Sequence, residues 1–475
     1  MSVRCRIAPA PSGFLHVGNA RTAMVNWLFA RHNDGVFVLR VEDTDADRVT
    51  DEGIEIIKRS LSWLGLQWDE GPDVGGPFGP YRQTERFELY REVAQQLRDG
   101  GHAYPCYCTP EELDERRKQA LARGEAPGYD GRCRNLTEQE RRAFEAEGRI
   151  PALRFAVPEG REIVVDDVIR GEGRFPADEL RDFIILRGDG SPTYLLASGV
   201  DDLRMQMTHV IRGEDLWSST PRQLLIFEAL GEEPPRYAHL PLILGPDRSK
   251  LSKRHGAVSV EYFREQGFLA DAMVNYMALL GWDPGEGQEI LPRDELVRRF
   301  ELEDVSHHPA IFDVQKLEWM NGHYIRETPD DELAALMLPF LAEAGMQADP
   351  EMVRAAVPLI KERMSKLTDS VALLRFLFVE ELQPDEKAAA GIAAVGPEYL
   401  REAASRLEAV EEWTVGEITR VLDDLREGAG LSRKKGWQPI RAAVTGSMVS
   451  PPLPESMTLL GKDRTLERLH VAGGG

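Results

Sequence analysis

The sequence is poor in cysteine and has no long apolar run. Only 4 of its 475 residues are cysteines, too few for a small secreted scaffold stapled by disulfides. No apolar stretch approaches the length that spans a membrane, and residues 1–5 (MSVRC) carry no apolar signal-peptide core. We therefore expect a cytoplasmic protein that does not bind a membrane.

Positive charge is also scarce. Lys and Arg number 58 against 80 Asp and Glu, which gives a formal net charge of −22. Such a chain is not a general nucleic-acid binder, because phosphate contacts need positive charge. It can still bind one specific RNA if its basic side chains gather on one face. The length is too great for one core, so we expect about two to four domains.

A Gly/Pro-rich loop at residues 9–19 (PAPSGFLHVGN) organises the N-terminal part of the chain. It follows a predicted strand at residues 3–8 and precedes a predicted helix at residues 20–31, with a second strand predicted at residues 36–41. A helix N-terminus offers unpaired N–H groups and the positive end of the helix dipole. The pattern therefore predicts a phosphate site, with Gly18 allowing close approach to the backbone.

Two short motifs, taken together, indicate a family. Residues 16–19 (HVGN) resemble the H-I-G-H motif of class I aminoacyl-tRNA synthetases, and residues 250–254 (KLSKR) resemble the second class I motif, K-M-S-K-S. Either motif alone is weak, because short matches arise by chance and basic pentapeptides are common in loops. Their order, their separation and the flanking text at residues 41–45, 211–215 and 319–322 resemble the bacterial-type glutamyl-tRNA synthetases over nearly the whole chain.

The resemblance implies an α/β class I fold. A Rossmann-like nucleotide-binding domain with an α/β insertion would be followed by an all-helical C-terminal anticodon-binding region. The expected segments are the first half of the catalytic domain (1–105), an inserted module that binds the acceptor end of tRNA (106–189), the second half with the lysine loop (190–255), a stem-contact domain (256–325) and the helical anticodon-binding region (326–475). Within the second half, strand texture predicts strands at residues 191–198 and 208–215.

The implied activity is that of a glutamate–tRNA ligase. The α-carboxylate of L-glutamate would attack the α-phosphorus of ATP, giving glutamyl-adenylate and pyrophosphate. The terminal ribose hydroxyl of tRNA-Glu would then attack the adenylate. This chemistry needs positioning and charge stabilisation rather than a side-chain nucleophile, and Mg²⁺ would accompany the triphosphate. We expect the chain to act as a monomer.

The resemblance also carries site residues over, position by position. For glutamate, the matching positions are Arg6, Ala8, Ser12, Glu42, Tyr194, Ser198 and Arg212. For ATP, they are His16, Gly18, Asn19, Asp215, Ile243 and Lys253. The expected catalytic residues are His16, Lys250 and Lys253. Ser198 stands where some relatives have Asn.

Several of these side chains have a direct physical reason for their place. A guanidinium group such as that of Arg212 can hold a carboxylate through two parallel hydrogen bonds; the alternative is a surface arginine at a strand end. Glu42 follows a predicted strand beside the phosphate loop, where it either holds an ammonium group or belongs to an Asp-rich turn. Ammonium groups at Lys250 and Lys253 would stabilise the charge that develops on the phosphates.

Three of the cysteines are clustered and suit a metal. Cys106, Cys108 and Cys133 offer three soft ligands for Zn²⁺, which takes four. Many relatives supply His or Asp two residues after the third cysteine, but Asn135 stands there in this chain. Tyr129 is the candidate fourth ligand, because a related family uses tyrosinate in this way. The alternative is a module that has lost its metal and keeps buried thiols.

Two basic clusters stand out in the acidic C-terminal part. The first contains Arg363, and the second contains Arg433, Lys434, Lys435 and Arg441 with Trp437 between them. Basic side chains with an aromatic ring suit an unstacked RNA loop, so we expect these residues to bind tRNA; the alternative is ordinary helix surface charge. Arg363 falls where glutamate-only enzymes carry an arginine that rejects glutamine anticodons.

Three other functions stay open at this point. One alternative is an enzyme that charges tRNA-Gln as well as tRNA-Glu, although Arg363 weighs against this. A second is a glutamylating enzyme that modifies a tRNA base, but those relatives end before the helical anticodon part. A third is a catalytically silent RNA-binding paralogue, against which the intact His16, Lys250 and Lys253 argue.

Overall fold

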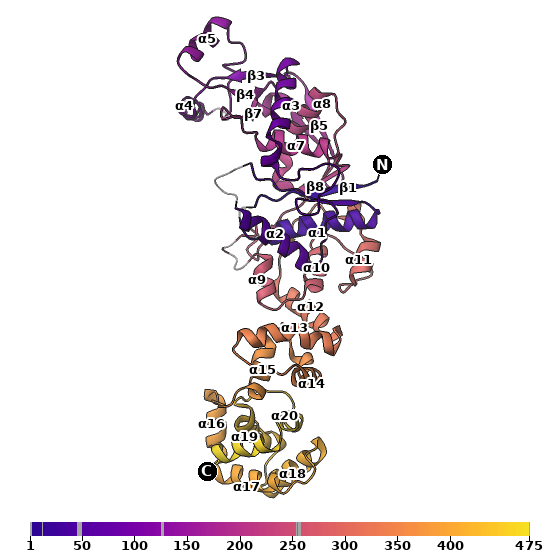
Figure 1. Cartoon of the computed structure of the whole chain (residues 1–475), viewed down its shortest axis with the longest axis vertical. Helices are drawn as coiled ribbons and strands as arrows, with labels where there is room; N and C mark the ends of the chain where they lie inside the picture. Colours follow the sequence, from indigo (N-terminus) through magenta and orange to yellow (C-terminus); the bar gives the residue numbers. More distant parts are fainter. Residues whose placement is uncertain are drawn as a thin grey trace. The chain divides into compact units, whose positions relative to one another are not determined.

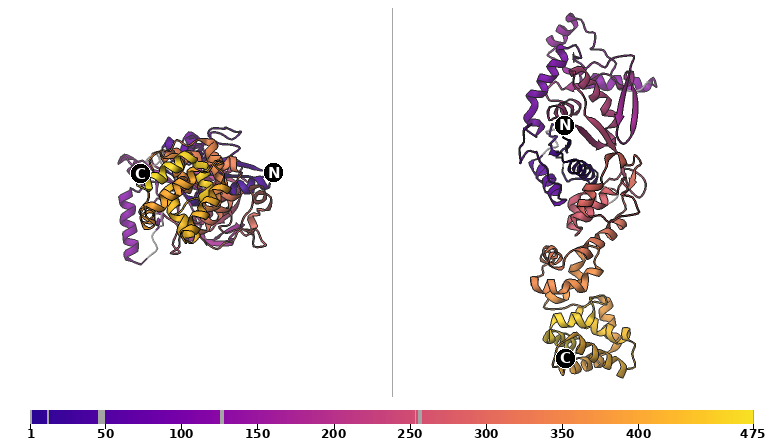
Figure 2. Two further views of the ribbon diagram at one scale, coloured as in Figure 1. Left: turned by 90° about the horizontal axis from the view of Figure 1, so that it is seen from below. Right: turned by 90° about the vertical axis from the view of Figure 1, so that its right-hand side faces the viewer.

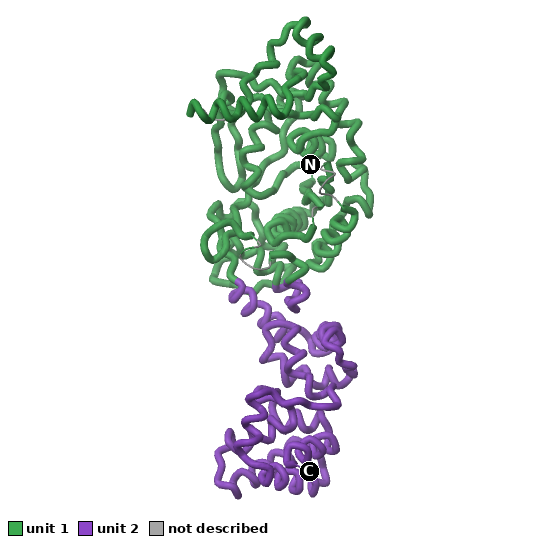
Figure 3. The backbone as a smooth tube through the Cα atoms, turned by 90° about the vertical axis from the view of Figure 1, so that its left-hand side faces the viewer, with its two compact units in different colours: residues 1–262, 273–313 green, residues 263–272, 314–475 purple. Residues whose placement is uncertain are grey.

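The structure is a computed structural model that describes residues 2–11, 13–44, 50–124, 128–252, 254 and 258–474. Strands and helices alternate up to β11 (Ala310–Ile311), and no strand follows it among these residues (Figures 1 and 2). The chain forms two compact units (Figure 3). Unit 1 contains residues 1–262 and 273–313, and unit 2 contains residues 263–272 and 314–475.

The N-terminal strand–helix–strand pattern is confirmed. β1 (Arg4–Ile7) and β2 (Val36–Leu39) pair in parallel, and α1 (Val17–His32) connects them. The imidazole of His16 caps α1 by accepting a hydrogen bond from the backbone N–H of Gly18. The Gly/Pro-rich loop, where the sequence predicts a phosphate site, therefore leads directly into a helix N-terminus.

The second half of the nucleotide-binding fold adds a sheet with the strand order β6-β5-β9-β8. Its elements are α7 (Tyr194–Arg204), β8 (His209–Gly213), η2 (Glu214–Ser219), α8 (Thr220–Leu230), β9 (Arg236–Leu240) and β10 (Ile243–Leu244). β8 and β9 are parallel, and the N–H of Thr208 donates to the carbonyl of Arg4, which brings β1 beside the start of β8.

One predicted strand is wrong. Residues 191–198 run into α7, which begins at Tyr194, whereas the strand predicted at residues 208–215 is present as β8. Leu196, Ala197 and Val200 are buried on one face of α7 against the core. A short apolar run cannot distinguish a buried helix from a strand by periodicity alone, and here tertiary packing decides for the helix.

The inserted module is built on short antiparallel strands. β4 (Ala152–Phe155) lies between β3 (Ala103–Cys106) and β7 (Phe183–Leu186), and β5 (Glu162–Asp167) pairs with β6 (Gly171–Pro176). Its helices are α4 (Pro110–Ala122), α5 (Glu138–Ala146) and α6 (Ala177–Leu180). Thr109 and Glu112 form a capping box at α4. Because β5 also pairs with β9, the module is continuous with the nucleotide-binding sheet.

The remaining helices of unit 1 surround this core. They are α2 (Asp51–Trp63), η1 (Gln83–Arg86), α3 (Phe87–Asp99) and α11 (Arg293–Arg299). α9 (Val260–Glu265) and α10 (Ala270–Ala278) each cross from one unit to the other. No helix among the described residues is both long and apolar enough to cross a membrane.

The described part of unit 2 is helical, as predicted. Its helices are α12 (Val314–Glu327), α13 (Asp330–Glu343), α14 (Pro350–Ile360), η5 (Lys361–Arg363), α15 (Asp369–Phe378), α16 (Glu386–Val395), α17 (Pro397–Glu408), α18 (Val415–Gly428), α19 (Arg433–Thr445), α20 (Leu453–Leu460) and α21 (Lys462–Ala472). One apolar cluster runs through them, and Leu333, Met337 and Leu341 contribute to it from the inner face of α13.

Candidate active site

A cavity of about 420 Å³ opens in unit 1 where β1, β8 and β9 end and α1 begins. In open α/β sheets, ligands bind at this edge. The predicted site residues that line it are Arg6, Ala8, His16, Gly18, Asn19, Glu42, Tyr194, Arg212, Asp215, Ile243 and Lys250. Ser198 does not line it, and Ser12 and Lys253 lie outside the described residues.

One end of the cavity carries two buried guanidinium groups. Arg6 and Arg212 are each only 3% exposed, although both face the cavity. Nη1 of Arg212 donates to the hydroxyl oxygen of Tyr194 at 3.1 Å, which aligns the phenol beside the guanidinium. Two cations held in a poorly solvated wall form a strong site for an anion such as a carboxylate.

Glu42 brings one negative charge to the same end. Its Oε1 accepts a hydrogen bond of 3.0 Å from Nη2 of Arg40, a fully buried arginine. Burial raises the pKa of Glu42 above its ordinary value, although the guanidinium groups of Arg40 and Arg6 act in the opposite direction. An ammonium group arriving at Glu42 would favour the ionised carboxylate and be bound by it.

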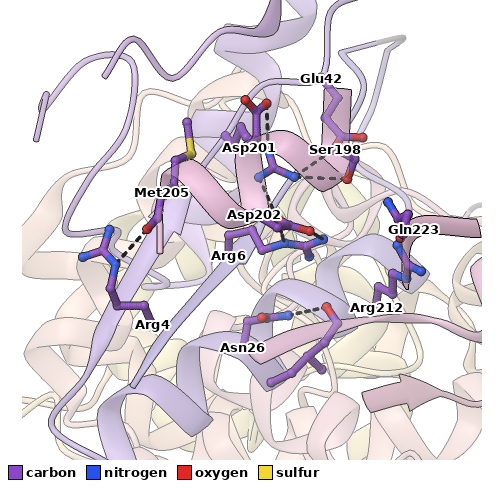
Figure 4. A network of polar contacts seen from close by, with 12 residues as sticks. Arg4, Arg6, Asn26, Glu42, Ser198, Asp201, Asp202, Met205, Arg212 and Gln223 are labelled. Carbon is purple, nitrogen blue, oxygen red and sulfur yellow. Dashed lines mark hydrogen bonds and ion pairs between the residues drawn. The ribbon is translucent and has the colours of Figure 1, made fainter. Parts of the chain in front are cut away.

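A network of buried charges holds these side chains in place (Figure 4). The carboxylate of Asp202 accepts hydrogen bonds from Arg6 at 2.9 Å and 3.2 Å and from Arg40 at 2.7 Å. Nearby, Asp201 accepts hydrogen bonds from Arg86, Gln83 and Tyr90. Although burial opposes ionisation, Arg6 and Arg40 hold the pKa of Asp202 below its usual range.

The sequence prediction missed this network. Asp201 and Asp202 fall in α7, the segment whose N-terminal part the sequence analysis assigns to a strand, and Arg40 lies in the chain between β2 and Glu42. A sequence signal did exist, because adjacent acids inside an apolar run need cationic partners when they are buried. Ser198 belongs to this layer, since it is fully buried and its hydroxyl accepts a hydrogen bond from Nη2 of Arg40 at 3.3 Å.

The other end of the cavity is the N-terminus of α1. Nδ1 of His16 accepts the N–H of Gly18 at 3.0 Å, so the neutral ring carries its proton on Nε2. Gly18 and Asn19 present the first turn of α1, which contains no acidic residue. Backbone donors, the helix dipole and a ring donor at one place suit phosphate.

Backbone hydrogen bonds join the phosphate loop to the segment that follows the lysine loop. The N–H of Val17 donates to the carbonyl of Val258 at 2.8 Å, and the N–H of Val260 donates to the carbonyl of Leu15 at 3.0 Å. His16 and Ser259 form the bridge between these bonds. Two segments about 240 positions apart in the chain are therefore fixed to one another beside the cavity.

A small hairpin brings the lysine loop to the cavity. The N–H of Leu251 donates to the carbonyl of Ile243 at 2.9 Å, and Leu244 and Lys250 form a bridge. Ile243 therefore supplies an apolar wall, and the exposed Lys250 follows it on the other strand of the hairpin.

Arg21 is a further cationic residue of the cavity that the sequence prediction missed. It lies in α1, is 3% exposed and donates from Nη1 to the carbonyl of Pro241 at 2.8 Å. Burial lowers the pKa of Arg21 to about 10, so it remains a cation at neutral pH. Its position directly after the HVGNA letters was the available signal.

Comparisons with known proteins agree with this geometry. A family model described as the catalytic domain of class I tRNA synthetases (E and Q) matches residues 2–319, and one described as an anticodon binding domain matches residues 332–472. The glutamate–tRNA ligase of Symbiobacterium thermophilum is 47% identical over 481 residues, which cover 99% of each chain. The chain belongs to the glutamate–tRNA ligases, a class I family of tRNA synthetases.

Other members of the glutamate–tRNA ligases support this assignment along the whole chain. That of Moorella thermoacetica is 46% identical over 482 residues, covering 99% of this chain and 98% of its own. A crystal structure of the Elizabethkingia meningosepticum glutamate tRNA ligase in complex with its amino acid matches with a TM-score of 0.89 and 34% identity. The match covers 100% of this chain and 99% of that chain.

The three clustered cysteines meet in the inserted module of this family member. Their sulfur atoms lie within 4.8 Å of one another, with Cys108 and Cys133 3.5 Å apart. The hydroxyl of Tyr129 lies 3.5 Å from the sulfur of Cys106 and 4.0 Å from that of Cys108. Hydrogen bonds from Cys108 and Cys133 lower the pKa of Cys106, so one thiolate is favoured even before a cation is considered.

The predicted tRNA-binding residues of unit 2 differ in their surroundings. Arg363 is exposed at the end of η5, and Lys434 and Lys435 are exposed in the first turn of α19. The guanidinium of Arg433 lies 4.0 Å from the centre of the Trp437 ring. Arg441 differs from the others because it is partly buried, and its Nη1 donates to the carbonyls of Ser450 and Pro451.

Proposed function

We propose that the cavity of unit 1 is where this chain activates L-glutamate with ATP. One observation carries the proposal: Arg6 and Arg212 share one end of the cavity with Glu42, and the N-terminus of α1 forms the other end. Glutamate has a second carboxylate for the two guanidinium groups and an ammonium group for Glu42. A triphosphate matches the backbone donors and the ring donor of His16.

In the first step, an oxygen of the glutamate α-carboxylate attacks the α-phosphorus of ATP and pyrophosphate leaves, giving glutamyl-adenylate. Lys250 and Lys253 neutralise the charge that moves onto the α-phosphate and the leaving group. His16 donates from Nε2 to the phosphates, and Ile243 and Asp215 hold the adenosine. Mg²⁺ would enter with ATP and would share the neutralisation of the triphosphate.

In the second step, the terminal ribose hydroxyl of tRNA-Glu attacks the carbonyl carbon of the adenylate. The ester bond forms, AMP leaves, and the hydroxyl proton passes to the phosphate that departs. Arg6, Tyr194 and Arg212 keep the glutamyl group fixed during both steps, which is the main requirement of such a transfer. Because the product feeds translation, we propose that the enzyme is cytoplasmic. We also propose that it works as a monomer.

We further propose that the chain charges tRNA-Glu and not tRNA-Gln. Arg363 supports this, since it is exposed at the end of η5 and near enough to Arg441 to lower the pKa of that arginine, after the larger effect of burial. An exposed guanidinium group such as that of Arg363 suits the phosphates and base edges of an unstacked anticodon, and the partly buried Arg441 adds to the positive charge there. Arg433, Lys434 and Lys435 add exposed positive charge in the first turn of α19.

Aminoacylation with radiolabelled glutamate tests these assignments together. Purified tRNA-Glu and tRNA-Gln would each be offered to the wild type and to Arg212→Ala, Lys253→Ala and Arg161→Ala. Arg161 is a suitable control, because it is an exposed arginine paired with Glu228 outside the cavity. We expect the wild type to charge tRNA-Glu alone. Arg212→Ala and Lys253→Ala should lose most of this charging activity, and Arg161→Ala should keep it. Charging of tRNA-Gln would overturn the discrimination and keep the chemistry.

We also propose that Cys106, Cys108, Cys133 and Tyr129 bind one Zn²⁺. A tetrahedral ion with bonds of about 2.3 Å to sulfur and about 2.0 Å to oxygen requires ligand separations of roughly 3.5–3.8 Å. In this cluster two contacts measure 3.5 Å and one measures 4.0 Å, and the three sulfur atoms lie within 4.8 Å of one another. The Tyr129 hydroxyl oxygen accepts the N–H of Cys133 at 2.9 Å, and the Arg154 guanidinium lies 3.7 Å from the ring centre. Burial and the hydrogen bonds with the cysteines raise the pKa of Tyr129, and the N–H of Cys133 acts in the opposite direction, so a phenolate would form only with the cation bound. Bound zinc would fix the inserted module.

Thiol counting separates a zinc site from a module that has lost its metal. With zinc bound, a chromogenic thiol reagent would find no reactive cysteine in the native protein and three after a chelator is added. Cys5 is the internal control, because it is fully buried in β1 and burial raises the pKa of its thiol to about 12. Three reactive thiols without a chelator would refute the site. Tyr129→Phe should weaken zinc binding roughly tenfold or more.

A further inference from the structure

Arg212 is held by more partners than the substrate would require. A guanidinium group has five N–H donors. In Arg212, Nε donates to Nε2 of His239 at 3.1 Å, Nη2 donates to the hydroxyl oxygen of Thr220 at 2.9 Å, and Nη1 donates to Tyr194 at 3.1 Å. Nη2 also donates to the carbonyl of Leu216 at 3.4 Å. The Nε edge is therefore committed to His239, and a substrate carboxylate would meet the guanidinium group from the side of its terminal nitrogens.

The proton positions on His239 follow from its other partner. Nδ1 of His239 lies 2.6 Å from Oδ2 of Asp167, and both side chains are fully buried. Asp167 is held ionised: the His239 ring and backbone N–H donors lower its pKa, although burial acts in the opposite direction. A carboxylate can only accept, so Nδ1 carries the ring proton. Nε2 then presents a lone pair, which is what the N–H of Arg212 requires.

We propose that His239, fixed as the Nδ1–H tautomer by Asp167, is a positioning residue for glutamate recognition. Its neutral Nε2 aims the guanidinium of Arg212 at the substrate carboxylate. The inference rests on the proposed role of Arg212 in the cavity and adds two residues, neither of which lines it. Thr220 closes the arrangement, because its hydroxyl accepts from Arg212 and lies 3.1 Å from the same Nε2.

The surroundings of His239 also favour the neutral ring. The charged and titratable groups that face it are Asp167 from β5, Arg170 just beyond β5, Arg212 from β8 and Tyr237 from β9, whose ring stacks 5.9 Å away. Trp217 from η2 meets it edge-on at 5.1 Å. Burial lowers the pKa of His239, and the attraction of Asp167 only partly offsets this. At neutral pH the ring therefore remains an acceptor toward Arg212.

Asp167→Asn is the sharpest test, because it changes the tautomer and little else. Oδ1 of Asp167 accepts the backbone N–H groups of Ile169, Arg170 and His239. The amide oxygen of Asn would keep these bonds, so its NH₂ group would face Nδ1. The ring proton would then move to Nε2 and oppose the N–H of Arg212. An amide replacing such a carboxylate has this effect on other buried histidines.

ATP–pyrophosphate exchange with tRNA present would be measured at neutral pH. For Asp167→Asn we expect the KM for glutamate to rise roughly 10- to 100-fold, the factor for one hydrogen bond to a charged group, with the KM for ATP unchanged. His239→Gln, which has no second nitrogen for Asp167 to control, should cost less. Adding Asp167→Asn to His239→Gln should change the glutamate KM by about twofold at most.

The matched control is His209→Gln. His209 is a buried histidine of the neighbouring strand β8 that bonds to Thr208 and does not line the cavity, so its glutamate KM should stay that of the wild type. The positioning role is wrong if Asp167→Asn raises the glutamate KM by the same factor in the wild type and in His239→Gln. It is also wrong if Asp167→Asn folds and keeps the wild-type glutamate KM. An unchanged glutamate KM in Arg212→Ala would instead show that the carboxylate site itself is misassigned, and the inference would fall with it.

Discussion

The ammonium nitrogen of Lys250 lies 3.0 Å from Oδ2 of Asp215, and both side chains line the cavity. The pair is exposed, with the two side chains 60% and 54% accessible. Exposed ion pairs stabilise a fold by only about 0–1 kcal/mol. The contact is therefore strong enough to orient Lys250 toward the cavity and weak enough to be exchanged for a phosphate.

We expect Lys250→Ala to slow adenylate formation by roughly 10²- to 10³-fold, the usual loss when one preorganised charge-stabilising group is removed. The KM for glutamate should change little, because Lys250 belongs to the phosphate end. Single-turnover formation of glutamyl-adenylate with tRNA present would measure both quantities. Lys58→Ala is the control, since Lys58 is paired with Glu55 in α2 and does not line the cavity. A Lys250→Ala enzyme as fast as that control would contradict the assignment.

Asp202→Asn should destabilise the fold strongly. Its carboxylate is fully buried between Arg6 and Arg40, and removing one partner from such a group leaves uncompensated buried charge. We expect the free energy of unfolding to fall by about 3–5 kcal/mol, measured by denaturant titration of the whole protein. Glu228→Gln breaks an exposed bidentate pair with Arg161 and should cost no more than about 1 kcal/mol. Equal losses in the two variants would refute the importance of burial.

The sequence predicts the residues that line the cavity better than the buried residues that hold them in place. Motifs near the N-terminus and at residues 250–254 locate two loops that line the cavity, because a phosphate site needs particular residue types in sequence order. Asp202 and His239 belong to no such motif, and the adjacent acids at residues 201–202 signal only that cationic partners exist, not which ones. Asp202 bonds to Arg6, which is 196 positions away, and His239 bonds to Arg212, which is 27 positions away. Only the three-dimensional fold brings these pairs together.

The pH dependence of glutamate binding should report on Glu42. Burial raises its folded-state pKa, so as pH falls this carboxylate takes up a proton earlier than an ordinary glutamate and stops attracting the substrate ammonium. We expect the KM for glutamate to rise on the acid side of neutrality, before free glutamate itself is protonated near about pH 4.3. Steady-state kinetics from about pH 8 to about pH 5 would measure it. The rise should persist in His239→Gln and vanish in Glu42→Gln, whose KM should be high throughout.

The buried acids differ in whether they stabilise or destabilise the fold as pH falls. For Glu42, whose pKa is raised, the folded state binds its proton more tightly, so this group favours the fold as pH falls. For Asp202 and Asp167, whose pKa values are lowered, the stabilisation is present above their ordinary pKa and lost as pH falls below it. We therefore expect unit 1 to unfold in acid when Asp202 and Asp167 become protonated.

Arg363 and Arg441 should respond differently to replacement by alanine. Arg363 is exposed, so its loss should weaken tRNA-Glu binding and reduce the salt dependence of that binding by roughly 0.7–0.9 for each phosphate contact removed. Arg441 bonds to the carbonyls that follow α19, so its loss should lower the melting temperature of the protein. Filter binding at several salt concentrations and thermal melts would separate the two effects. A stable Arg441→Ala protein would contradict the structural role.

The long separation between Arg6 and Asp202 has a consequence for protein synthesis. A ribosome makes Arg6 almost at once, but its buried partner follows 196 positions later, and unit 1 is complete only at residue 313, about two thirds of the way along the chain. Domains fold as units as they emerge. Until then, the nascent chain carries cations without their counter-charges and keeps this part of the core open. We therefore expect the N-terminal part of the growing chain to stay unfolded longest during synthesis.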